Sequence, residues 1–161
     1  MDTLTDWLWV GGAAAGLGAA LVLLWGPLWG LGREVLVVRA RESFRLQRER
    51  LEAKFFDAAA RSGKPRGLRW KDCSFENPLE LARDRRTGQL IALVPVTIAF
   101  EAVEGGPMEG VEAVGNLRNA TAVFVFEHGH WATSGKAVFN MNPDEALRHF
   151  HNQYERVGNG K

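Results

Sequence analysis

The chain has 161 residues, of which 46% are hydrophobic and 24% charged, with a formal net charge of +1 and one cysteine, Cys73. This length accommodates one domain and an additional segment, and a single cysteine excludes an intramolecular disulfide framework. The net charge is −2 over residues 1–32, +3 over residues 33–62 and zero over residues 63–161. Because nucleic-acid binding needs a basic face on the fold itself, the neutral C-terminal part argues against a nucleic-acid partner.

The first feature in chain order is an uncharged stretch of 26 residues from Trp7 to Gly32. About 20 helical residues cross the ~30 Å hydrocarbon core of a bilayer, so this stretch is long enough to span it. Tryptophans, which favour membrane interfaces, lie near both ends: Trp7, Trp9, Trp25 and Trp29. The start "MDTLTDW" is acidic, whereas a secretory signal begins with basic residues. We therefore predict a transmembrane anchor over residues 1–32, in preference to a cleaved signal or a buried core helix.

Within the predicted anchor, small residues recur at a spacing of four. They are Gly12, Gly16 and Ala20. Small residues at this spacing let two membrane helices approach closely enough for van der Waals packing to hold them together. We expect the anchor to contact the lipid bilayer and to pack against a membrane-protein partner or a second copy of the chain.

Arginines follow the predicted anchor, and no basic residue precedes it. They are Arg33, Arg39, Arg41, Arg45, Arg48 and Arg50. Basic residues mark the cytoplasmic side of a membrane helix, which predicts a single-pass protein with its N-terminus outside and its C-terminal domain in the cytoplasm. The first five of these arginines have two candidate roles, as a topology signal on a solvated face or as ligands for anionic lipid headgroups.

Residues 33–63 have the pattern of a basic, amphipathic juxtamembrane helix. The apolar stripe is interrupted around Gln47, and Gly63 followed by Pro65 is typical of a helix end. Its members recur at helical spacing: Val37, Ala40, Phe44, Leu51, Phe55 and Ala58.

Residues 64–161 have the alternation of an antiparallel sheet. Strands are expected at 68–77, 79–84 and 89–103, followed by a hairpin over 119–140 that turns near His128 and Gly129, and then by a helix over 142–157. Pro95, inside the third strand, indicates an edge or a bulge. One face of that strand is apolar: Ala92, Val94, Val96, Ile98, Phe100 and Ala102. The predicted fold is α+β, with a long helix on a roughly five-stranded antiparallel meander and a C-terminal helix.

This order of elements resembles the cystatin-like and NTF2-like α+β rolls. The segments "LARDRRTGQLIALVPVTIAFEAVEGG" and "AVGNLRNATAVFVFEHGHWATSGKAVFNMNP" also resemble uncharacterised single-pass bacterial membrane proteins, which implies a bacterial inner membrane. NTF2-like enzymes carry acid and base residues inside the cone of the roll. Here the expected inward positions are apolar and form a candidate pocket instead: Val96, Ile98, Phe100, Phe124 and Phe126.

The histidines fall in two pairs, His128 with His130 and His149 with His151. Side chains two apart on a helix point in different directions, and the other pair lies at a hairpin tip, so we expect no metal site, no cofactor and no catalytic residue. The sequence therefore favours a non-enzymatic, membrane-anchored accessory or scaffold subunit. The alternative is a tethered roll that binds a lipid or another small molecule, and an enzyme is a weaker third reading. A cavity above about 300 Å³ with convergent polar groups would favour the last two.

Overall fold

A computed structural model describes residues 34–62 and 65–157 of the chain. The chain divides into two compact units, Met1–Leu36 and Val37–Lys161, and the second unit contains nearly all described residues. The predicted anchor, with its small residues, its tryptophans and Arg33, lies outside the described residues. Within the described ranges, no helix is long and apolar enough to cross a membrane.

Two helical segments precede the sheet, and they meet at Gln47. The first is helical over residues 34–46, and the second, α2, spans Arg48–Arg61. The backbone of Gln47 (φ −109°, ψ 11°) departs from helical geometry, at the position where the apolar stripe is interrupted. The predicted stripe is confirmed except at its end, because Ala59 replaces Ala58 as the buried residue: Val37, Ala40, Phe44, Leu51, Phe55 and Ala59.

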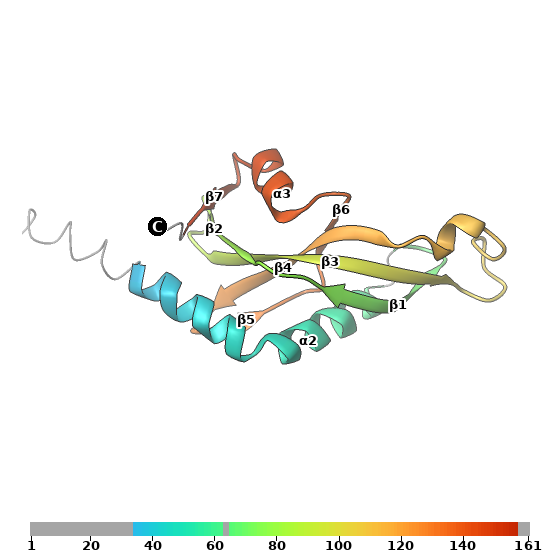
Figure 1. The fold of residues 1–161 in the computed structure, drawn as a ribbon, viewed down its shortest axis with the longest axis horizontal. Coiled ribbons are helices and arrows are strands. Elements are labelled where there is room, and N and C mark those ends of the chain that lie inside the picture. Colours follow the sequence, from blue (N-terminus) through green and yellow to red (C-terminus); the bar gives the residue numbers. More distant parts are fainter. Residues whose placement is uncertain (1–33, 63–64, 158–161) are drawn as a thin grey trace, which may run out of the picture. The chain divides into compact units, whose positions relative to one another are not determined.

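In the described part of the chain, seven antiparallel strands form one sheet, whose arrangement Figure 1 shows. They are β1 (Leu68–Phe75), β2 (Glu80–Asp84), β3 (Leu90–Ala102), β4 (Arg118–Glu127), β5 (His130–Ala132), β6 (Ala137–Phe139) and β7 (Tyr154–Arg156). Both β1 and β2 pair with β3 on one side, while β4 pairs with it on the other side. Both β5 and β6 pair with β4, and a short 3-10 helix, η1 (Glu112–Gly115), lies in the loop before β4.

The α+β class and the antiparallel sheet are confirmed, but the prediction of about five strands is wrong. The second arm of the predicted hairpin is divided into β5 and β6, with residues 133–136 between them. In this linker Gly135 has a φ of 74°, and a Cβ there would clash with the backbone of Ala59 in α2. Only glycine lets the linker pass this close to the helix.

Pro95 was predicted to mark an edge or a bulge, and the edge alternative is wrong because β3 is a central strand. Pro95 pairs with Thr121 of β4 in the middle of the sheet, and its carbonyl accepts a hydrogen bond from the Glu76 amide at 3.0 Å. Glu76 belongs to the break between β1 and β2, which includes the cis Asn77-Pro78 bond. Neither β1 nor β2 pairs with β3 at Pro95. The sheet therefore loses no hydrogen bond there, although proline has no N–H.

The predicted C-terminal helix is too long. Helix α3 spans only Pro143–His149, and its N-terminus carries a capping box in which the Asn142 side chain accepts from the Glu145 amide. The chain leaves helical geometry at Phe150 (φ −99°, ψ 29°). It then forms β7, where Tyr154 is buried and pairs with Asp84 of β2. Tyr154, which the sequence placed in a helix, therefore belongs to an end strand of the sheet.

Candidate functional site

One face of the sheet is covered by the two helical segments and forms the main core (Figure 1). Phe44 makes edge-to-face contacts with Phe124 and Trp131 at centroid distances of 5.1 and 5.3 Å. The Trp131 indole N–H donates to the Ala40 carbonyl at 2.8 Å. Residues 37–62 therefore belong to the same core as the sheet, although the sequence assigned them to a separate segment.

The residues predicted to line an apolar pocket lie on this helix-covered face. Four are buried and Phe126 is partly buried: Val96, Ile98, Phe100, Phe124 and Phe126. Phe55 of α2 packs on Phe124 at 5.8 Å, and Trp70 packs on Phe100 at 5.1 Å. These side chains are core residues here, and a ligand-binding role for them stays a prediction.

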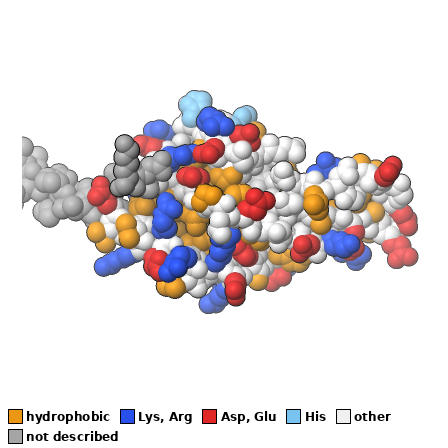
Figure 2. Space-filling model, in the orientation of Figure 1, with side chains coloured by type: hydrophobic (Ala, Val, Ile, Leu, Met, Phe, Trp, Pro, Cys, Tyr) orange, Lys and Arg blue, Asp and Glu red, His pale blue; other side chains and the backbone are white. Residues whose placement is uncertain are grey.

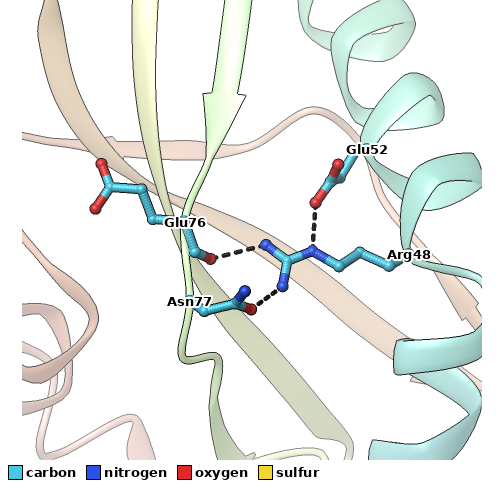
Figure 3. Close-up of polar contacts among 4 residues, drawn as sticks. All are labelled: Arg48, Glu52, Glu76 and Asn77. Carbon is cyan, nitrogen blue, oxygen red and sulfur yellow. Dashed lines mark hydrogen bonds and ion pairs between the residues drawn. The ribbon is translucent and has the colours of Figure 1, made fainter.

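Arg48 links α2 to the break between β1 and β2 (Figure 3). Its guanidinium donates to the Glu52 carboxylate at 2.6 Å, to the Glu76 carbonyl at 2.8 Å and to the Asn77 side-chain oxygen. The Arg48 side chain is 22% exposed. Three acceptors from two elements match the fixed fork of an arginine, so this residue fastens the helix to the strand break.

The second face of the sheet is only half covered. Leu147 of α3 and Tyr154 of β7 pack on Ile91, Leu93 and Val123 in a smaller cluster. Figure 1 shows α3 over this face, on the side opposite α2. Further along β3 and β4, the same face carries Pro95, Thr97 and Asn119, which the structure leaves partly or fully exposed.

A polar depression of about 500 Å³ occupies this uncovered part of the sheet; we call it the groove. It is lined by residues of β3 and β4, of the break between β1 and β2, of the segment between η1 and β4, and of the start of α3: Glu76, Pro95, Val96, Thr97, Leu117, Arg118, Asn119, Ala120, Asn140, Met141, Asn142 and Glu145. The volume of the groove exceeds the roughly 300 Å³ typical of the smallest ligand pockets. The groove lies, however, on the face of the sheet opposite the predicted apolar pocket.

Hydrogen bonds orient several side chains in the groove. The Thr97 hydroxyl lies 3.2 Å from a Glu76 carboxylate oxygen and 3.4 Å from the Asn119 amide oxygen. A carboxylate oxygen of Glu145 accepts a hydrogen bond from the Asn142 backbone amide at 2.9 Å. The Arg118 guanidinium donates to the Ala113 carbonyl at 3.3 Å. The groove thus presents carboxylates, amides and a hydroxyl that bind polar groups through hydrogen bonds.

The predicted headgroup or topology arginines separate into two groups. Arg39, Arg41 and Arg45 are exposed on the first helical segment, and Arg45 pairs with Glu42 at 2.8 Å. Arg48 instead points into the fold, where it binds the strand break. In the structure, Arg48 therefore links α2 to the break between β1 and β2.

Cys73 and the histidines lie away from the groove lining. Burial, together with the charge of Asp72, raises the pKa of the Cys73 thiol from 9.0 to about 12, so it is not a thiolate at neutral pH. His128 and His130 are exposed at the β4–β5 turn, where His128 has a φ of 50°. His149 and His151 are exposed at and after the end of α3. No cluster of three metal-ligating side chains occurs among the residues that the structure describes.

Sequence reasoning missed the groove because its lining comes from four separate parts of the chain. The available signal lies in β3, where the run from Leu90 to Val94 is wholly apolar and the residues from Pro95 to Glu101 include polar positions. A continuous apolar run indicates burial on both faces, whereas alternation indicates one exposed face. No family model matches this chain, and no curated protein or solved structure matches it either.

Proposed function

We propose that this protein is a non-enzymatic, membrane-anchored accessory or scaffold subunit, which presents the groove of its cytoplasmic α+β domain to a partner protein in a membrane assembly. One observation carries the proposal: the two faces of the sheet differ, because one is filled by helices and half of the other is open and polar. An antiparallel sheet needs cover only where it is apolar. The uncovered half carries polar side chains, so it can stay open to a partner.

The chemistry of the groove supports recognition. The Thr97 hydroxyl lies within hydrogen-bond distance of the Glu76 carboxylate and of the Asn119 amide oxygen; it donates its one proton to one of them at a time, which restricts these side chains before a partner arrives. Preorganised polar groups lower the entropic cost of association. The anchor predicted over residues 1–32 would hold this surface at the membrane.

Purification of the tagged full chain from native membranes in mild detergent tests the proposal. Asn119→Arg places a long cation in the groove and should abolish co-purification of the partner. Ala60→Arg makes the same kind of change at an exposed position of α2 and should leave the partner bound. Equal recovery of the partner with both variants, or no partner with the unmodified chain, would contradict the proposal.

The anchor is tested separately. We expect the full chain to remain in the membrane fraction after carbonate washing, with its C-terminal domain accessible to protease only from the cytoplasmic side. Recovery in the soluble fraction would refute the anchoring part of the proposal while leaving the groove test interpretable.

A second candidate function is binding of a polar small molecule in the groove. The volume of about 500 Å³ and the mixed lining favour it, since ligand pockets fall in the range of about 300–1,000 Å³. Native mass spectrometry distinguishes the two functions. A small molecule bound at one equivalent to the purified chain, and lost in Asn119→Arg, would favour this alternative.

A further inference from the structure

Four large apolar side chains of the first helical segment are exposed: Val35, Leu36, Val38 and Leu46. Val38 is 67% exposed and Leu46 is 73% exposed, whereas Val37, Ala40 and Phe44 on the same segment are buried. Val38 and Leu46 therefore form a second strip that the sheet does not cover, with Glu42 between them at four residues from each. Leu46 is the most exposed of the large hydrophobic residues in the described part of the chain.

Helical spacing places arginines beside this strip. Arg41, Arg45 and Leu46 follow Val38 by three, seven and eight residues, which are the spacings of one helix face. At 100° per residue, Arg39 lies on the other flank of the strip. Figure 2 shows hydrophobic, basic and acidic side chains intermixed over this end of the described unit. An apolar strip flanked by arginines is the pattern of helices that lie in a membrane interface.

We propose that this face of the helix, defined by Val38, Arg39, Arg41, Arg45 and Leu46, lies on the anionic lipid surface of the membrane. The inference rests on the proposed anchoring. Val38 would enter the boundary between headgroups and acyl chains together with Leu46, and the arginines would contact lipid phosphates. Arg48 takes no part, because its guanidinium binds Glu52, Asn77 and the Glu76 carbonyl.

The position of the face in the chain selects lipid as its occupant. Val38 follows Gly32, the end of the uncharged stretch, by six residues. The predicted anchor would therefore hold this face close to the membrane surface, where an anionic leaflet attracts basic residues. Arg39, Arg41 and Arg45 against Glu34 and Glu42 give residues 34–46 a net charge of +1, complementary to anionic lipid.

Labelling of the full chain in proteoliposomes tests the proposal. Leu46→Cys, in a Cys73→Ser background, carries an environment-sensitive fluorophore, and Lys54→Cys, exposed on α2, serves as the matched control. In vesicles that contain phosphatidylglycerol we expect a blue-shifted emission at position 46 and none at position 54. The shift should decrease in vesicles of phosphatidylcholine alone, and in the variant that also carries Arg39→Gln and Arg41→Gln.

Identical emission at positions 46 and 54 in both kinds of vesicle would overturn the inference. Carbonate washing of the same vesicles separates this outcome from failure of the anchor. A chain that is retained but shows no shift is anchored without lying on the surface. A chain that is washed away refutes the anchoring on which the inference rests.

Discussion

The two faces of this sheet are built from the same strands and differ in what covers them. On the helix-covered face, alternate residues of β3 such as Val94, Val96 and Ile98 are fully or almost fully buried. On the other face, Ile91 and Leu93 are buried under α3 and β7, but Thr97, farther along the same strand, lines the groove. The contrast shows that one strand can contribute to a core along its whole length on one side and to an open polar surface along part of its length on the other.

The helix-covered face should tolerate truncation least. Phe55→Ala removes a fully buried ring that contacts Trp70, Phe75 and Phe124 at centroid distances of 5.6–6.2 Å. We expect the free energy of unfolding to fall by about 3–5 kcal/mol, as for other buried aromatic residues. Thr97→Ala in the groove should cost less than about 1 kcal/mol. Urea denaturation measures both, and similar losses for the two variants would remove the distinction between the faces.

Two neighbouring residues of β1 allow the two faces of the sheet to be compared by the alkylation rate of a thiol. Cys73 packs against the main core, whereas Ser74 is exposed and pairs with Thr97. With a pKa of about 12 in place of 9.0, Cys73 should react with iodoacetamide at pH 8 up to about a thousandfold more slowly than an unperturbed thiol, since only the thiolate attacks. Ser74→Cys, made in Cys73→Ser, should react at an ordinary rate.

The same shift in pKa makes stability depend on pH. The folded state holds the proton of Cys73 more tightly than the unfolded chain does, so this contribution to stability is complete below pH 9.0 and is lost as the pH rises toward about 12. The Cys73→Ser variant should lack this part of the alkaline decline. Equal alkylation rates for Cys73 and the cysteine at position 74 would contradict the assigned burial.

The link between helix and strand break should contribute an intermediate amount. Arg48→Ala removes donors to Glu52, Asn77 and the Glu76 carbonyl, and we expect a loss of about 1–2 kcal/mol. Arg48→Lys should recover only part of it, because an ammonium cannot reproduce the guanidinium fork. Arg50→Ala, at an exposed position of the same helix, should change stability by less than about 0.5 kcal/mol.

The cap of α3 should contribute less to stability than the Arg48 link does. Asn142→Ala removes the side-chain acceptor for the Glu145 amide at 2.9 Å, which should cost about 1 kcal/mol. Asn142→Ser keeps a capping oxygen and should stay close to the unmodified chain. Thermal melts compare the variants, and a larger loss for Ser than for Ala would show that the residue acts in some way other than capping.

The elements that local patterns specify were predictable from the sequence. The apolar stripe from Val37 to Phe55 and its interruption at Gln47 correspond to the buried residues and to the change in backbone direction. The apolar face of β3 from Ala92 to Phe100 is likewise confirmed. In each case the signal is a period of 3.6 or 2 residues within one segment.

The features that depend on distant segments were not predictable in the same way. Pro95 is accommodated in a central strand because β1 and β2 break opposite it. The apolar pattern that includes Tyr154 indicates a helix, but Tyr154 lies in a strand, where it pairs with Asp84. The groove combines Glu76, Thr97 and Asn119 with the start of α3, and no local period identifies such a combination.

Site-specific photocrosslinking in native membranes tests the central claim most directly. A photoreactive amino acid at Asn119, within the groove, is compared with one at Lys54, which is exposed on α2. The proposed function predicts a discrete covalent adduct with one membrane-assembly protein from position 119 and none from position 54. The absence of an adduct from position 119, or the same adducts from both positions, would contradict the claim that the open half of the sheet is the partner-binding surface.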